Sequence, residues 1–249
     1  MLNHKSLDLY ETDLMKHIIL ASTSTVFGSG FLEYLLPELE RHFDRVDEIV
    51  FIPYARPNGI SHSEYTKKVE SVFNKIGKSV VGLHEYQSPQ DGIQEAQGIF
   101  TGGGNTFVLV KALYDHRLMP ILRDSLLKGT PYLGTSAGSN ICGQTLGTTN
   151  DMPIVYPPSF DTLKMVDFNI NPHYLDPDPS STHMGETRET RIHEFHQFND
   201  IPVVGLREGS FLEIYGNDVI LKGNREARIF EKGRSPYEIP ISTNLNTLK

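Results

Sequence analysis

Apolar residues in the first half of the chain fall into short continuous runs that alternate with longer amphipathic segments. The amphipathic segments, residues 30–43, 62–77 and 106–129, space their apolar side chains at helical intervals, and the last is long enough for one or two helices. The short runs are typical of strands buried on both faces, and they occupy residues 17–22, 47–55, 78–86, 96–105 and 131–136. This alternation predicts a doubly wound α/β fold with a mostly parallel sheet.

The last third of the chain has a different pattern. Residues 203–233 alternate strand-like runs with turns at Gly216-Asn217-Asp218 and Lys222-Gly223-Asn224. Strands joined by such short turns predict antiparallel strands added to the edge of the parallel sheet. The sequence shows no internal repeat and no linker, so we predict a single domain over residues 1–249. Residues 1–15 and about 235–249 are expected to be peripheral extensions of that domain.

Composition and charge narrow the function classes. The net charge of −8 argues against nucleic acid as a partner, because binding phosphates requires a basic surface. The single cysteine, Cys142, excludes an intrachain disulfide and a zinc site built from cysteines, and it fits a reducing compartment. The N-terminal residues lack the apolar core of a signal peptide, and no apolar stretch approaches the ~20 residues of a membrane helix. We therefore expect a soluble cytoplasmic protein without nucleic-acid or membrane partners.

The segment Gly134-Thr-Ser-Ala-Gly138 carries the first candidate for chemistry. It fits the pattern G-x-S-x-G, and it falls where a predicted strand ends and a helix begins. A sharp turn at that point exposes the serine, so Ser136 is a candidate nucleophile, with the N–H of Ala137 directed toward a developing oxyanion. The alternative interpretation is a loop that merely contains small residues. Cys142, one turn farther on, is expected to be a small buried residue.

The glycine-rich segment Thr101-Gly-Gly-Gly-Asn105 follows the preceding predicted strand. Ligands gather beyond the carboxyl ends of parallel strands, so this loop is expected beside Ser136. Its glycines let the backbone approach a ligand and donate N–H groups to it. The segment lacks a Gly-Lys-Ser/Thr ending, and no G-x-G-x-x-G follows the first strand. A second oxyanion donor is therefore favoured over a phosphate cradle or a plain flexible turn.

A serine nucleophile needs a base, and His173 stands out among the ten histidines. It follows a strand-like run and a proline, which is how a strand end presents a side chain at the edge of a sheet. His183 lies in a polar loop. His193 and His196 occur in the spacing H-E-x-H rather than the zinc-binding H-E-x-x-H, so we expect both on a helix surface and predict no metal site.

The base in turn requires an orienting carboxylate. Asp151 would give the chain order Ser, Asp, His, whereas Glu208 follows a predicted strand and so lies at a strand end. The sequence leaves this choice open. The alternative for either residue is a turn carboxylate without a catalytic role.

Six motifs occur in register along the chain: GGGNTF (102–107), GTSAGSN (134–140), TTNDMPIV (148–155), INPH (170–173), GETRE (185–189) and LREGS (206–210). Together they resemble peptidase E, the α-aspartyl dipeptidase family of serine peptidases. The resemblance runs from about residue 17 to residue 233, and IPYA at residues 52–55 also fits it.

The resemblance implies a sheet like that of class I glutamine amidotransferases, which is flavodoxin-like. It also implies hydrolysis of dipeptides with an N-terminal aspartate through an acyl-enzyme, without a cofactor or a metal. Ser136 would be the nucleophile and His173 the base, with Asp151 or Glu208 as the third member. The N–H groups of Gly104 and Ala137 would form the oxyanion hole. Thr135 and Ser139 depart from the family, which often has a bulky residue such as Trp before the serine and Ala or Thr after Gly138.

Specificity for a substrate aspartate requires a cation, and arginine binds a carboxylate through two parallel hydrogen bonds. The family motif GETRE places Arg188 in this role, and Asn105 is assigned to the same substrate site. Asp151 or Glu186 is expected to receive the α-ammonium group of the substrate. The alternative for Arg188 is a surface helix of paired charges.

Two other functions compete with this prediction. A relative in the same peptidase group degrades cyanophycin, a polymer of aspartate and arginine; it would share Ser136 and His173 but release β-linked dipeptides. A silent regulatory or binding module on the same sheet would show no serine reactivity. The sequence does not distinguish a monomer from a homodimer.

Overall fold

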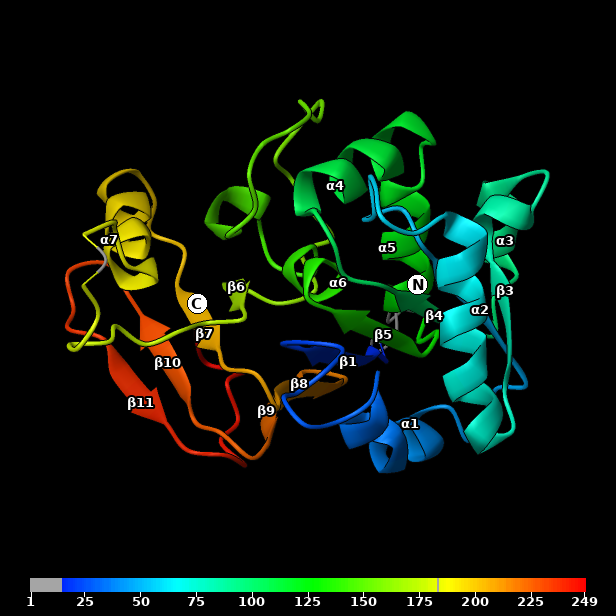
Figure 1. Ribbon diagram of the computed structural model, residues 1–249, viewed down its shortest axis with the longest axis horizontal. Coiled ribbons are helices and arrows are strands. Elements are labelled where there is room, and N and C mark those ends of the chain that lie inside the picture. The colour runs from blue at the N-terminus through cyan, green and yellow to red at the C-terminus, as the bar shows by residue number, and fades with distance from the viewer. Residues whose placement is uncertain (1–14, 183) are drawn as a thin grey trace, which may run out of the picture.

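A computed structural model describes residues 15–182 and 184–249 (Figure 1). The predicted N-terminal extension, apart from Met15, and His183 lie outside the described residues. A seven-stranded sheet forms the larger half of the molecule. Five neighbouring strands are parallel, and two antiparallel strands follow them at one edge. In spatial order they are β3 (Ser79–Gly82), β2 (Glu48–Ile52), β4 (Gly98–Thr101), β5 (Tyr132–Thr135), β1 (His17–Ala21), β8 (Ser210–Tyr215) and β9 (Asp218–Gly223).

Helices cover both faces of the parallel part of this sheet. Apolar side chains of α1 (Leu36–His42) and α2 (His62–Phe73) pack on one face, in a cluster with alternate residues of β1, β2 and β4. The opposite face packs against α3 (Pro89–Gln94), α4 (Thr106–Asp115) and α5 (Met119–Leu127). A short helix, α6 (Ala137–Asn140), follows β5 directly. This is the doubly wound arrangement predicted from the alternation of strands and helices.

The predicted helices differ from the observed ones mainly at their boundaries. The segment 30–43 contains the 3₁₀ turn η1 (Glu33–Leu35) and then α1, which has Pro37 in its first turn, where a missing N–H costs no hydrogen bond. The segment 62–77 is α2 followed by η2 (Asn74–Ile76). The segment 106–129 divides into α4 and α5, because the chain turns at Arg117, which has a φ of 56°. Two further 3₁₀ turns are η3 (Leu83–Glu85) and η4 (Leu146–Thr148).

The second half of the molecule is a separate four-stranded sheet, which the sequence did not predict. Its order is β11 (Tyr237–Ile239), β10 (Ala227–Phe230), β7 (Val203–Leu206) and β6 (Asn169–Pro172), with β6 and β7 parallel. Figure 1 shows these strands together, with α7 (Arg188–Phe198) beside them. Only β8 and β9 form the predicted antiparallel edge, while β10 leaves β9 and pairs with β7.

Alternation of side chains explains why a second sheet is stable. Val204 and Leu206 of β7 belong to the main core, whereas Val203 points to the other face and packs with Ile192 of α7. Each face of the second sheet therefore has its own apolar partner.

The residues from about 235 onward, which were predicted to be peripheral, contribute one edge strand and one buried side chain to the fold. β11 pairs with β10, Leu245 is 4% exposed within the main core, and the N–H of Leu245 donates to Val219. Residues near the C-terminus thus lie along β9, at one edge of the large sheet. Among the helices of the described residues, none combines the length and the apolar character needed to cross a bilayer.

Candidate active site

A small cavity of about 180 Å³ lies at the carboxyl ends of the central strands. Five of the predicted site residues line it: Ser136, Ala137, Asp151, His173 and Arg188. Its other lining residues are Thr106, Asn140, Thr149, Asn150 and Pro172. Segments that are distant in the sequence therefore meet around one space.

Ser136 occupies a strained turn between β5 and α6. Its backbone has φ 54° and ψ −110°, a conformation that residues with a side chain rarely adopt. The turn is held because the Ser136 N–H donates to the carbonyl of Ala21 at 3.1 Å. A Cβ atom on Gly138 would lie 2.1 Å from the carbonyl oxygen of Thr101, so only glycine allows the turn to approach β4 this closely. The second glycine of the G-x-S-x-G pattern is therefore sterically required at the turn between β5 and α6.

The glycine loop after β4 lies directly against this turn. The Cβ position of Gly103 is 2.9 Å from the Cβ atom of Ser136. The carbonyl of Gly103 accepts hydrogen bonds from Arg56 Nε at 3.1 Å and the Tyr65 hydroxyl at 3.4 Å. A trans peptide directs its N–H opposite to its C=O, so the Gly104 N–H is directed away from Arg56 and Tyr65. The Gly104 N–H therefore points to the side of the loop opposite Arg56 and Tyr65, where it can donate a hydrogen bond.

His173 is paired with Glu208. The Nδ1 atom of His173 lies 2.6 Å from Glu208 Oε1, and the two side chains are 36% and 51% exposed. His173 directly follows β6 and Glu208 comes two residues after β7, so the parallel pairing of these strands brings the two side chains to the same edge. An acceptor at Nδ1 places the proton on that nitrogen and leaves Nε2 as the basic atom.

Asp151 makes different contacts. Its Oδ2 atom accepts from the N–H of Thr106 at 2.7 Å and from the Thr149 hydroxyl at 3.1 Å. The carboxylate therefore caps the N-terminus of α4, where a negative charge is favourable. The structure brings Glu208, and not Asp151, to His173, while Asp151 keeps its place in the wall of the small cavity.

Arg188 begins α7 and lines the small cavity from the side of the second sheet. Its Nη1 atom donates to the carbonyl of Pro172 at 3.3 Å. Partial burial lowers the pKa of Arg188, while the negative charge of Glu208 acts in the opposite direction. In the part of the chain that the structure describes, no carboxylate lies within 4 Å of this guanidinium. A half-buried cation of this kind favours an anionic ligand.

Two residues assigned to the substrate site lie outside the cavity. Glu186 is 56% exposed and faces Arg191 at 3.7 Å. Asn105 caps α4 by accepting from the Val108 N–H, and its amide donates to the carbonyl of Met152. Neither side chain lines the small cavity, so Asn105 holds the loop around Asp151 in place and Glu186 belongs to a surface pair.

A larger cavity of about 420 Å³ adjoins the small one, because His173 and Arg188 line both. Its other lining residues are Tyr174, Leu175, Asp176, Arg207, Glu208 and Arg225. Arg207 is held in ion pairs with Asp176 and Glu238. The two cavities together form a site with His173 and Arg188 at its middle.

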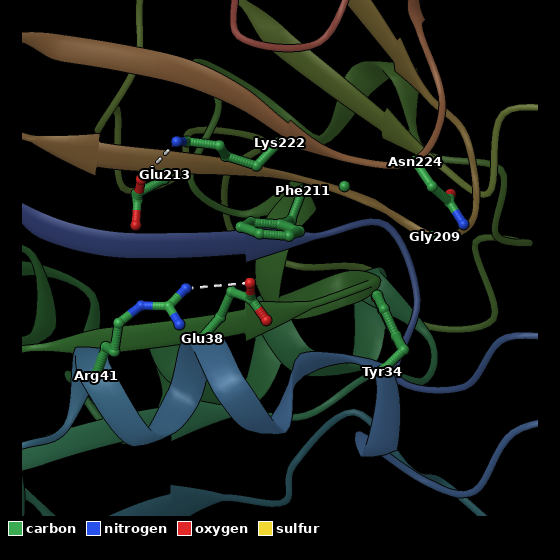
Figure 2. Close-up of a pocket in the computed structure, with 9 residues that line it drawn as sticks. Tyr34, Glu38, Arg41, Gly209, Phe211, Glu213, Lys222 and Asn224 are labelled. Atoms are coloured by element: carbon green, nitrogen blue, oxygen red, sulfur yellow. Dashed lines mark hydrogen bonds and ion pairs between the residues drawn. The ribbon is translucent and has the colours of Figure 1, made fainter.

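A third cavity, of about 440 Å³, lies between α1 and the β8–β9 hairpin (Figure 2). Figure 2 shows that its two cations face carboxylates: Arg41 is 3.1 Å from Glu38, and Lys222 is 3.6 Å from Glu213. None of the residues predicted for the site lines this cavity. Its charges are already paired, so it is not a candidate for binding an anionic substrate.

The structure also tests the predictions made for Cys142, His193 and His196. Cys142 is fully buried, as predicted. His196 is not on the helix surface: it is 4% exposed and its Nε2 donates to the carbonyl of Ile201. His193 is exposed and lies 3.7 Å from Glu189. Within residues 15–182 and 184–249, no cluster of three or more His, Cys, Asp or Glu side chains is arranged to hold a metal.

Two asparagines of the small cavity, Asn140 and Asn150, were not predicted from the sequence. Asn150 donates to the carbonyl of Pro172 at 2.9 Å, and Asn140 donates to the carbonyl of Ile170. Both bonds fix β6 next to the nucleophile turn. Their positions in the motifs TTND and GTSAGSN were the only available signal, because their partners lie more than twenty residues away.

Comparison with known proteins agrees with this architecture. Peptidase family S51 matches residues 18–222. The chain is 46% identical over 232 residues to "Peptidase E" of Streptomyces coelicolor, covering 93% of this chain and 94% of that protein. It is 42% identical over 236 residues to "Probable alpha-aspartyl dipeptidase" of Drosophila melanogaster, covering 94% and 97%.

The fold is also similar to that of a solved structure. The crystal structure of a peptidase from an acI-B1 Actinobacterium superposes with a TM-score of 0.67, over 95% of this chain and 99% of the other, at 15% identity. This similarity and the sheet topology confirm the predicted flavodoxin-like, class I glutamine amidotransferase-like fold class. The match over residues 18–222 and the identities above 40% identify the chain as a member of peptidase family S51.

Proposed function

We propose that the protein is a serine dipeptidase that hydrolyses dipeptides with an N-terminal L-aspartate. The observation that carries the proposal is the meeting of Ser136, His173 and Arg188 around one cavity, with His173 held by Glu208. A nucleophile, a base and an anion-binding group are the parts that such a reaction requires. The names of the relatives in Streptomyces and Drosophila support the same activity.

The chemistry proceeds by acyl transfer. His173 Nε2 accepts the hydroxyl proton of Ser136 as its Oγ attacks the peptide carbonyl. The N–H groups of Gly104 and Ala137 stabilise the oxyanion. The C–N bond then breaks, and the leaving amine takes the proton from His173. Water, deprotonated by His173, hydrolyses the aspartyl ester and regenerates the serine hydroxyl.

Glu208 stabilises the imidazolium that forms during both proton transfers. Its carboxylate lies 2.6 Å from Nδ1, so it fixes the ring orientation and compensates the positive charge. Asp151 is already engaged at the N-terminus of α4 and has no contact with the ring. We therefore assign the third position of the triad to Glu208.

The shape and charge of the site account for the proposed substrate. The small cavity, about 180 Å³, accommodates one short residue, with Arg188 binding the side-chain carboxylate. Asp151 lines the same cavity and is assigned to the α-ammonium group, a role for which Glu186 lies too far outside. The general acid must reach the leaving amine, so the second residue extends past His173 into the larger cavity.

Hydrolysis of a dipeptide panel tests the proposal. Asp-Leu, Asn-Leu, Glu-Leu, Ala-Leu and β-Asp-Leu are compared with wild-type protein and with Ser136→Ala. We expect cleavage of Asp-Leu alone, and loss of it in Ser136→Ala by a factor on the order of 10⁴–10⁶. Preference for β-Asp-Leu would move the assignment to a cyanophycinase-like hydrolase. No cleavage, with no labelling of Ser136 by a fluorophosphonate, would indicate a silent module.

A further inference from the structure

Ser22 is a buried polar residue that the proposed mechanism does not use. It directly follows β1, the strand between β5 and β8, and its exposed fraction is 0%. It lines neither cavity of the candidate site. A fully buried hydroxyl costs free energy unless it is hydrogen-bonded, so its partners indicate what it does.

The Ser22 hydroxyl joins the two strands that carry the base and its carboxylate. It donates to the carbonyl of Leu206, the last residue of β7, at 2.7 Å. It accepts from the backbone N–H of His173 at 2.9 Å. Glu208 lies two residues beyond Leu206. One hydroxyl therefore binds both the backbone of His173 and the end of β7, the strand that leads to Glu208.

The same strand end holds the nucleophile. The carbonyl of Ala21, the residue before Ser22, accepts from the Ser136 N–H at 3.1 Å and from the Ser139 hydroxyl at 2.7 Å. The last residue of β1 and the residue that follows it thus contact the nucleophile turn and the backbone of the base. Hydrogen bonds at this point therefore connect the nucleophile turn of the large sheet to the strand ends of the second sheet.

His173 needs such a restraint. Its backbone has a φ of 54°, a conformation that is unfavourable for a residue with a side chain. Strained conformations persist only where the surroundings over-determine them. The bond from the His173 N–H to Ser22, together with the bond from the Tyr174 N–H to Leu206 at 3.1 Å, supplies this restraint.

We propose that Ser22 is a positioning residue that sets the placement of His173 and Glu208 relative to Ser136. The proposal rests on the proposed roles of Ser136 and His173, but not on the identity of the substrate. Ser22 acts through the backbone of its partners and does not touch the substrate. Its loss displaces the base from the nucleophile, and a misplacement of about 1 Å costs on the order of 100-fold in rate.

Ser210 offers a matched control. It is also 0% exposed, and its hydroxyl donates to the carbonyl of Arg225 at 2.7 Å and accepts from the Arg225 N–H at 3.1 Å. Substitution of either serine by alanine therefore removes one donated and one accepted hydrogen bond of a buried hydroxyl. Only Ser22 links the nucleophile turn to the base.

The experiment measures the second-order rate at which a fluorophosphonate labels Ser136, located by mass spectrometry, in wild type, Ser22→Ala and Ser210→Ala. We expect Ser22→Ala to label about 10- to 100-fold more slowly, and Ser210→Ala within two-fold of wild type. With Asp-Leu, kcat of Ser22→Ala should fall by a similar factor, whereas KM should stay within two-fold. Thermal unfolding of both variants measures the loss of stability. If Ser22→Ala does not fold, Ser22→Cys is used in its place, because cysteine has a similar volume but is a weaker hydrogen-bond donor.

Labelling of Ser22→Ala, or of Ser22→Cys in its place, at the wild-type rate would overturn the proposal. An equal slowing in Ser210→Ala would also overturn it, because the effect would then be a general loss of stability. Wild-type protein that is labelled at Ser136 but does not cleave Asp-Leu would refute the proposed substrate alone, and the labelling rates would still decide the role of Ser22. Wild-type protein that is not labelled at Ser136 would refute both.

Discussion

The two sheets of the molecule hold their parts of the site by different physical means. The large sheet presents Ser136 from β5, a strand with all four residues buried between apolar clusters on its two faces. The second sheet presents His173 and Glu208, and its outer face has a cluster of only four buried residues, Tyr174, Ile192, Val203 and Phe230. The strands β6 and β7, which carry the base and its carboxylate, are also fully buried, so the difference lies in the small apolar cluster on the outer face of the second sheet.

Ion pairs supplement that small cluster. Arg207 lies 2.6 Å from Asp176 and 2.7 Å from Glu238, and Arg228 lies 3.2 Å from Glu189 and 2.9 Å from Glu238. The network joins β7, β10, β11 and α7, and it borders the residues that carry the base. Steric contacts thus determine the backbone conformation at the nucleophile, whereas charged groups orient the side chains around the base. Substitutions in the two halves should have different consequences.

Glu208→Gln should have the largest effect. The amide cannot compensate an imidazolium charge, so we expect kcat for Asp-Leu to fall by a factor on the order of 10²–10⁴. The melting temperature should hardly change, because the Glu208 side chain is 51% exposed. Steady-state kinetics and thermal unfolding check the two parts of this prediction.

Asp151→Asn is the matched control for Glu208→Gln. Its amide oxygen can still accept from the Thr106 N–H, and the lost charge should raise KM with kcat within about ten-fold of wild type. A large fall in kcat for Asp151→Asn and a small one for Glu208→Gln would reverse our assignment of the triad.

Low pH should lower the free energy of unfolding because His42, which is buried in the large-sheet half, must take up a proton. Burial lowers the pKa of His42 to about 3, and its Nε2 donates to the carbonyl of Tyr132. The unfolded chain binds the proton near pH 6.5, so stability is complete above that pH and falls as the pH drops toward 3. The expected slope is about 1.4 kcal/mol per pH unit, or on the order of 5 kcal/mol in total.

Urea unfolding between pH 7 and pH 4 measures that slope. In His42→Leu the contribution of this histidine is absent, so the pH dependence should become shallower even if the variant is less stable overall. His17, whose ring lies 4.1 Å from that of His42, also has a pKa lowered by burial and should leave a smaller slope of the same sign. An unchanged slope in His42→Leu would contradict the prediction.

Gly138→Ala tests steric control of the nucleophile half. The new Cβ on α6 would lie 2.1 Å from the carbonyl oxygen of Thr101, the last residue of β4. We expect the free energy of unfolding to fall by about 3 kcal/mol, together with loss of fluorophosphonate labelling. Gly30→Ala is a suitable comparison, because its φ is not left-handed and the nearest atom to a Cβ there is the end of the flexible Glu33 side chain, at 3.0 Å. A folded and fully reactive Gly138→Ala would show that the turn is not sterically determined.

Arg207→Met should have the smallest effect. It removes charged hydrogen bonds from a side chain that is 14% exposed, so we expect a loss of about 2 kcal/mol and a few-fold change in kcat/KM. The exposed pair of Lys111 and Asp115 on α4 provides the control, since Lys111→Met should cost about 0.3–0.5 kcal/mol. Equal losses in the two variants would show that the network does not support the base.

Several features were predictable from the sequence because their causes are local. The strands and helices of the first half follow from apolar periodicity, and the nucleophile turn follows from small residues between a strand and a helix. Ser136, His173 and Arg188 were identified by motif, and all three line one cavity. Short-range sterics and the burial of apolar faces act within a few residues, so a linear pattern contains them.

Other features depended on contacts between distant segments. The second sheet arises because β10 pairs with β7 rather than with its neighbour β9, and its strand residues carry no mark of that choice. The choice between Asp151 and Glu208 required the parallel pairing of β6 with β7, which brings Glu208 to His173. Ser22 gained its place between Leu206 and His173 from residues more than 150 positions away. Periodicity along the chain determined which segments are buried, but the pairing of those segments was decided only by the free energy of the whole packed structure.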